Sequence, residues 1–326
     1  MVKNFLFSIL IFTVLLTGCS SSKKSEEKKE TTDKIEDVMT FNADSAFRYV
    51  EAQCDFGPRV PNSKAHRLCG DYLIEKLKSF GANVIVQSPV LTAYDGTKLQ
   101  ACNIIGEFAP EKTRRILLMA HWDCRPWADN DPDEKNHRKP VMGANDGASG
   151  VGVLLEIARL IGQKLPNVGV DIFFTDAEDW GDHAGTSPDS ERSWALGTQY
   201  WISNPHRLGY RPMYGILLDM VGARGSVFAH EYYSMQYAPA LVKEVWKTAR
   251  QSGYGNFFIN TTGGGITDDH VFVNRAGIPT IDIIAIDRTT ETGFVPQWHT
   301  IDDTMEHIDP ATLKAVGQTL INFIYQ

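Results

Sequence analysis

The feature that most constrains the fold is a series of four continuous apolar runs, separated by segments whose apolar residues recur at helical spacing. The runs predict strands at 115–123, 170–176, 214–221 and 278–286. Because polar residues do not alternate along these runs, we expect both faces of each strand to be covered. Strands that alternate with helices form parallel sheets with helices on both faces. The sequence therefore predicts an α/β fold with a mostly parallel, twisted central sheet.

The other periodic segments extend this pattern. They predict further elements, with helices at 42–57, 64–80, 148–162, 194–203, 239–253 and 310–325 and strands at 83–90 and 99–108. No linker-like break divides the chain after Phe41, and a chain of 326 residues that is 43% hydrophobic can bury a sizeable core. We therefore predict a single catalytic α/β domain over residues 41–326.

The N-terminus has a different composition. Lys3 precedes an apolar run at 5–16, which is typical of a secretory signal and too short for a comfortable membrane span. The "LTGC" that follows resembles the lipobox of bacterial lipoproteins, in which Cys19 becomes lipidated. The next residues are polar and charged, as in a disordered tether. We expect a signal peptide at 1–18, a lipoprotein tether at 19–40, and an exported protein on the periplasmic side or cell surface, held to a membrane through Cys19. The alternative is a plain signal peptide with an unrelated cysteine.

Charge and cysteine content narrow the function further. The net charge is −8 and no basic stripe occurs, which argues against a nucleic-acid partner. The even number of remaining cysteines in an exported chain permits disulfides, and we predict at least one. The absence of a CxxC pair argues against a thiolate zinc site. These cysteines are Cys54, Cys69, Cys102 and Cys124.

Acidic and histidine side chains follow the predicted strands at the points where the strands end. In open α/β sheets the site lies outside the carboxyl ends of the strands, so these side chains should converge there. Such a set of nitrogen and oxygen donors suits zinc. The alternative is that each residue serves as a separate cap or ion pair. The side chains are His121, Asp123, Asp146, Glu178, Asp179, Asp219 and His299.

Glu178 and Asp179 are adjacent, and two neighbouring carboxylates repel each other. A divalent cation beside Asp179 would offset that repulsion. Glu178, held close to the cation without binding it, would then carry protons.

Seven motifs together resemble the zinc-dependent glutaminyl cyclases, which share a fold with the zinc aminopeptidases of the same superfamily. The resemblance covers nearly all of the chain from Phe41 onwards. The motifs are "FGPRVPNSKAHR", "AHWD", "GANDGASGVGVLLEIAR", "FFTDAEDW", "LLDMVGA", "TDDHVFVNRAGIPTIDI" and "WHTIDD".

The resemblance implies roles for individual residues. One zinc ion per chain would be held by Asp146, Asp179 and His299. Glu178 would be the proton shuttle, and two further catalytic carboxylates would be Asp268 and Asp219, of which Asp219 matches a second-metal ligand in the aminopeptidases. The substrate pocket would be formed by Trp298 and His121.

The resemblance also implies the reaction. The α-amine of an N-terminal glutamine in a peptide or protein would attack its own side-chain amide, releasing ammonia and leaving pyroglutamate. The chain departs from the animal cyclases, which carry "EE" in place of Glu178-Asp179. It also departs from them in two long polar loops, 125–140 and 181–193. For Trp127 and Trp194, beside these loops, packing is favoured over a role in the pocket.

Two other functions remain open. In a two-zinc aminopeptidase the ligands would be His121, Asp146, Asp179, Asp219 and His299. Asp268 and Trp298 favour the cyclase, because the aminopeptidases tend to have a neutral residue and a tyrosine at these positions. The third reading is a non-enzymatic lipoprotein that only binds a partner. It is disfavoured because every matching ligand position holds a competent residue.

Overall fold

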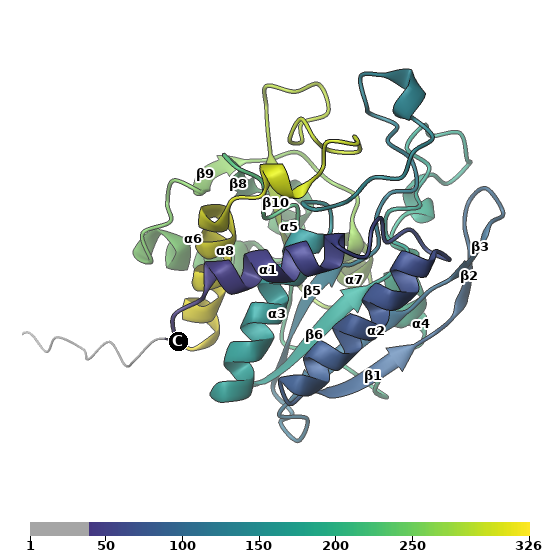
Figure 1. Cartoon of the computed structure of the whole chain (residues 1–326). Helices are drawn as coiled ribbons and strands as arrows, with labels where there is room; N and C mark the ends of the chain where they lie inside the picture. The colour runs from purple at the N-terminus through teal and green to yellow at the C-terminus, as the bar shows by residue number, and fades with distance from the viewer. Residues whose placement is uncertain (1–38) are drawn as a thin grey trace, which may run out of the picture. The chain divides into compact units, whose positions relative to one another are not determined.

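An eight-stranded sheet forms the centre of the computed structural model, which describes residues 39–326 (Figure 1). The predicted signal peptide, Cys19 and the tether up to residue 38 lie outside the described residues. Within the described part, no helix is both long enough and apolar enough to cross a membrane.

The strands of this sheet follow the spatial order β1-β4-β6-β5-β7-β10-β8-β9. The four central strands, from β6 to β10, run parallel, and antiparallel pairs flank them on both sides. A separate hairpin consists of β2 (Val90–Thr92) and β3 (Lys98–Gln100). The sheet strands are β1 (Asn83–Gln87), β4 (Asn103–Phe108), β5 (Arg115–His121), β6 (Gly169–Thr175), β7 (Gly215–Asp219), β8 (Val227–His230), β9 (Phe258–Thr262) and β10 (Thr280–Ile286).

Helices cover both faces of the sheet. Leu118 of β5 belongs to a core cluster with the apolar faces of α1, α2, α3, α6 and α8. Leu117, its neighbour in the strand, points to the opposite face and packs with Trp201 of α4 and Val273 of α7. The helices are α1 (Ala43–Cys54), α2 (Lys64–Ser79), α3 (Ala148–Gln163), α4 (Leu196–Ser203), α5 (Tyr232–Tyr237), α6 (Pro239–Gln251), α7 (Asp269–Arg275) and α8 (Pro310–Ile324).

The cysteines correct one prediction. Cys54, Cys69, Cys102 and Cys124 are all free in the structure, so no disulfide forms among them. They come from α1, from α2 and from the segments beside β4 and β5. A disulfide needs two facing Cβ atoms with Cα atoms less than about 7 Å apart, and an even count of cysteines says nothing about that geometry.

Candidate active site

Three side chains meet at the carboxyl end of the parallel strands and form what we call the cavity triad: Asp146, Asp179 and His299. One donor atom of each lies within 4.8 Å of the donor atoms of the other two. His299 Nε2 is 3.2 Å from Asp179 Oδ1 and 3.7 Å from Asp146 Oδ2. Both Asp179 oxygens are buried without a hydrogen-bond partner. The lone pairs of this carboxylate therefore remain available to a cation.

The cavity triad fits a zinc ion. Burial raises the pKa of Asp179 to about 6, although the nearby His299 opposes the shift. A buried carboxylate without a partner is costly unless its charge is balanced. Two carboxylates and one imidazole form a donor set that zinc accepts, with a fourth position left for a substrate. A cation here would also offset the repulsion expected between Glu178 and Asp179.

Asp129, in the polar loop 125–140, lies behind the ring of His299. His299 Nδ1 lies 3.4 Å from Asp129 Oδ1, and Arg125 Nε donates a hydrogen bond to the same oxygen at 3.1 Å. A carboxylate behind a histidine is the usual way to direct the other ring nitrogen toward a metal. Sequence reasoning missed Asp129, because nothing in the polar loop distinguished it from its acidic neighbours.

Backbone hydrogen bonds hold Asp146 in place. The Asp303 carboxylate accepts from the backbone N–H groups of Asn145 and Asp146, at 2.7 and 3.1 Å. The next residue, Gly147, lies so close to β5 that a Cβ there would be 2.3 Å from the His121 carbonyl oxygen. The motif "GAND" followed by glycine is therefore required for the close approach of this loop to the strand.

A single carboxylate, Asp123, anchors the adjacent acids Glu178 and Asp179. Its two oxygens accept from the backbone N–H groups of these residues, each at 3.2 Å. Because these hydrogen bonds involve only the backbone, the two side chains can lie in different environments. Only Asp179 joins the triad, while Glu178 lines the cavity beside it. This placement is compatible with the different roles that the resemblance implied for the two residues.

Glu178 is a buried acid whose surroundings favour its protonated form. Burial raises its pKa well above the ordinary value, and the charge of Asp268 adds to the effect. Asp268 is the N-cap of α7, and its Oδ2 is buried without a partner. Burial likewise raises the pKa of Asp268, followed by the charge of Asp219. Their surroundings therefore disfavour a state in which Glu178, Asp268 and Asp219 are all ionised.

A second layer of polar side chains lies behind Asp268. His270 Nε2 is 3.1 Å from Glu231 Oε2, and its Nδ1 is 3.8 Å from Asp282 Oδ2. Neither oxygen of Asp282 has a hydrogen-bond partner among the described residues. Burial, and then the charge of Asp268, raises the pKa of Asp282 well above its ordinary value. Sequence reasoning missed this layer, although an aspartate inside the apolar run 278–286 was a visible signal.

His121 was predicted as a pocket residue, but it is not among the residues that line the cavity. It is 1% exposed, with Nε2 at 2.9 Å from Asp146 Oδ1 and 3.2 Å from Asp219 Oδ1. As the last residue of β5, it points inward beneath the two carboxylates. These three residues also bring donor atoms within 4.8 Å of one another. The second metal position of the aminopeptidase alternative therefore exists in geometric terms.

The cavity has a volume of about 400 Å³ and aromatic walls. Trp298 stacks on the His299 ring at 3.9 Å between centroids, as a wall beside the triad. Trp194 also lines the cavity, contrary to the packing role predicted for it; a Cβ on Gly181 would overlap its ring. Trp127 packs edge-on against Trp180 and does not line the cavity, as predicted.

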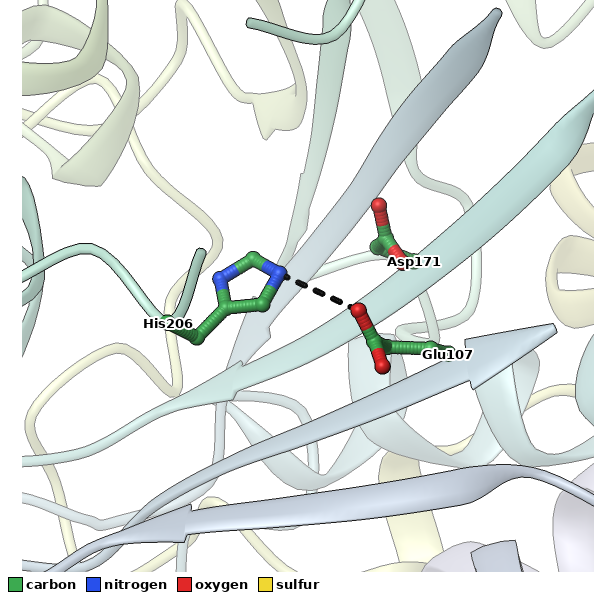
Figure 2. Close-up of side chains that lie close together, drawn as sticks. All are labelled: Glu107, Asp171 and His206. Atoms are coloured by element: carbon green, nitrogen blue, oxygen red, sulfur yellow. Dashed lines mark ion pairs between the residues drawn. The ribbon is translucent and has the colours of Figure 1, made fainter. Parts of the chain in front are cut away.

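A second group of the same residue types lies on β4, on β6 and in the segment after α4 (Figure 2). This sheet-edge cluster comprises Glu107, Asp171 and His206. His206 Nδ1 accepts from Trp201 Nε1 at 3.0 Å, which leaves the proton of a neutral ring on Nε2, 3.7 Å from Glu107 Oε1.

Both carboxylates of the sheet-edge cluster are already bound by donors. Asp171 Oδ2 accepts from Arg115 Nε at 2.8 Å and from the Tyr210 hydroxyl at 2.6 Å. Glu107 accepts from Asn83 Nδ2 at 2.7 Å and also from Arg207. Every carboxylate oxygen of the cluster already accepts at least one hydrogen bond, so we interpret this cluster as structural.

Comparisons with known proteins agree with this picture. Residues 103–324 match peptidase family M28. A glutaminyl cyclase from Bacteroides thetaiotaomicron is 59% identical, with a TM-score of 0.86 over 89% of this chain and 99% of that chain. A Zn-dependent exopeptidase from Parabacteroides distasonis is 56% identical, with a TM-score of 0.87 over 89% and 99%.

A more distant similarity extends to animals. Glutaminyl-peptide cyclotransferase of Bos taurus is 23% identical over 294 residues, which cover 82% of this chain and 78% of that protein. The predicted fold class and the resemblance to glutaminyl cyclases are confirmed by these similarities taken together.

Proposed function

We propose that this chain, which belongs to peptidase family M28, is a glutaminyl-peptide cyclotransferase that forms pyroglutamate from an N-terminal glutamine. The observation that carries the proposal is the placement of Glu178, a buried acid on the cavity wall, directly beside the unpartnered donors of the cavity triad. The 59% identical cyclase supports the same assignment.

The reaction needs one proton to move. The α-amine nitrogen of the substrate forms a bond to its own side-chain amide carbon, and the bond from that carbon to the amide nitrogen breaks. Glu178 takes a proton from the amine and delivers it to the departing ammonia. Burial, and then the charge of Asp268, raises the pKa of Glu178, which favours the protonated form that delivers the proton to the leaving group.

Zinc fits this scheme at a single position. Asp146, Asp179 and His299 would hold it, and when bound it supplies the Lewis acid that polarises the amide carbonyl. The aromatic walls formed by Trp298 and Trp194 would hold the flat amide and exclude water, which is not a reactant here. We propose one zinc ion per chain.

A two-zinc aminopeptidase is the second candidate, because His121, Asp146 and Asp219 also converge. The deciding experiment combines a metal count with assays on glutamine-initiated and leucine-initiated peptides. One zinc per chain with ammonia release from the glutamine peptide supports the cyclase. Two zinc ions, both required for release of leucine, would show the aminopeptidase. No turnover of either peptide would leave a binding lipoprotein.

The proposed location rests on the sequence alone. The "LTGC" motif and the polar segment after it support an exported lipoprotein anchored through Cys19. Cys19→Ala should release the protein from membranes or leave it unprocessed. Intact mass and membrane fractionation measure this outcome, and an unchanged mass with unchanged membrane association would contradict it.

A further inference from the structure

The catalytic cavity carries one cationic side chain at its rim. Five carboxylates and two histidines line the cavity, whereas Arg288 is the single lysine or arginine among the described lining residues. Arg288 is exposed, and its guanidinium donates to the Thr262 carbonyl oxygen of β9. A substrate held by its amine and amide inside the cavity must pass its following residues out over this rim.

A second hollow of about 570 Å³ begins where the cavity ends. Arg288 and Ile286 line both, so they form the shared wall. The second hollow also contains Arg224 and His307. Ser226 lines it as well. This residue is only 3% exposed, and its buried hydroxyl has no hydrogen-bond partner among the described residues.

The two arginines in this hollow outnumber its single carboxylate, Asp287. Arg224 and Arg288 are absent from the ion pairs that arginines form in the described chain. The single carboxylate that lines the hollow, Asp287, accepts hydrogen bonds from the backbone N–H and the hydroxyl of Thr289. Two guanidinium groups without an ion-pair partner and an unpartnered hydroxyl form a donor set for a carboxylate.

We propose that this second hollow is a subsite for an acidic side chain of the substrate, at the first or second residue after the N-terminal glutamine. The inference rests on the proposed function, because it assumes that the glutamine occupies the cavity. An extended chain advances at most about 3.3–3.6 Å per residue. The shared wall at Arg288 therefore places the subsite within reach of the residues that leave the cavity first.

The test uses matched peptides and the full-length, zinc-loaded protein. Gln-Glu-Ala and Gln-Ala-Glu are compared with versions that carry glutamine or lysine in place of glutamate. The variants are Arg288→Gln, Arg224→Gln and the charge reversal Arg288→Glu. The matched control is Arg250→Gln, an exposed arginine on α6 that lines neither hollow.

The wild-type protein should prefer the acidic peptide over its glutamine version by about two- to fivefold in kcat/KM, the size typical of an exposed ion pair. The preference should lie in KM, because the contact is the same in the ground state and the transition state. Either neutral variant should bring the ratio close to one, Arg288→Glu should favour the lysine peptide, and Arg250→Gln should change nothing. High salt should weaken the preference.

A wild-type protein without acid preference at low salt, or an Arg288→Glu variant that keeps it, would overturn the subsite. Each peptide is also made with leucine first. Turnover of the leucine versions alone would contradict the proposed cyclase. The ratio of kcat/KM for the acidic peptide to kcat/KM for its neutral version could still be measured with these leucine peptides. Failure of the proposed function is thus distinguishable from failure of the subsite.

Discussion

The cavity triad and the sheet-edge cluster contain the same chemistry, two carboxylates and one histidine. They differ in how their lone pairs are used. In the sheet-edge cluster both carboxylates accept hydrogen bonds, Asp171 from Arg115 and Tyr210. In the cavity triad both oxygens of Asp179 are buried and accept no hydrogen bond, and the nearby charge is that of His299, 3.2 Å away.

The comparison teaches that residue identity and proximity do not make a metal site. Buried polar groups are normally paired, and an unpaired one needs a reason. In the sheet-edge cluster no carboxylate oxygen is unpaired, because arginine, tyrosine and asparagine side chains donate a hydrogen bond to each one. At the cavity the orphaned oxygens indicate that an ion or a substrate belongs there. Four predictions test this contrast.

The largest effect is expected for Asp179→Ala, which removes a carboxylate of the cavity triad. Zinc and activity should be lost together, because two remaining donors do not complete a zinc site. Metal analysis and ammonia release measure both. The matched control is Asp171→Asn, which should keep its zinc. Zinc bound at the wild-type level in Asp179→Ala would refute the ligand assignment.

Glu178→Gln should separate chemistry from metal binding. The amide keeps the shape of the acid but cannot carry a proton, so turnover should fall by about 10²- to 10⁴-fold. Zinc content should stay at the wild-type level, and KM should change much less than kcat. Near-normal cyclisation of a glutamine peptide by this variant, or loss of its zinc, would remove Glu178 from the proposed role.

Asp171→Asn should have the opposite profile. It leaves the buried Arg115 without its carboxylate partner, and breaking a buried ion pair typically costs about 3–5 kcal/mol of folding stability. The free energy of unfolding in urea should fall accordingly, while kcat/KM on a glutamine peptide stays within about twofold. A stable variant with impaired turnover would mean that the sheet-edge cluster takes part in function.

The smallest effect is expected for Arg207→Gln, at the exposed side of the sheet-edge cluster. Burial favours the neutral form of Glu107, yet the hydrogen bonds from Arg207 and Asn83 hold its pKa below the ordinary value. A carboxyl group of this kind stabilises the fold above its unfolded pKa, and the contribution disappears as pH falls through the folded pKa.

Arg207→Gln should therefore cost about 1 kcal/mol at pH 7. The difference from the wild type should shrink as the pH is lowered below about 4. Urea unfolding at several pH values measures this trend. A difference that grows on acidification would contradict the assignment of Arg207 as the partner of Glu107.

Much of the fold could be predicted because the central strands are apolar on both faces. The runs 115–123, 170–176, 214–221 and 278–286 all became strands of the sheet. Their ends also predicted that acidic and histidine side chains converge, because the geometry of a parallel sheet brings strand ends together, and Asp146, Asp179 and His299 do lie together. The outer elements were missed: β8 and β9, and the short helices α5 and α7. β9 has one buried residue, Phe258, and its pairing with β8 depends on tertiary contacts that leave no periodic pattern.

The parts of the site that escaped prediction are those set by side-chain direction. His121 was correctly placed at the end of a strand, but the sequence did not show that it points beneath Asp146 and away from the cavity. Trp194 and Trp127 looked equivalent, and only the space left by Gly181 admits one of them to the cavity wall. A resemblance transfers residue roles, whereas the direction of a side chain depends on the packing around it.

The anchoring of Glu178 and Asp179 by the single carboxylate of Asp123 has a consequence for inhibitor design. The backbones of the two acids are fixed to the same group, so the distance between the proton carrier and the proposed metal position varies little. A compound that joins a metal-binding head to a hydrogen-bond donor for Glu178 can therefore be made rigid. Its selectivity would then come from the part that leaves the cavity over the rim at Arg288.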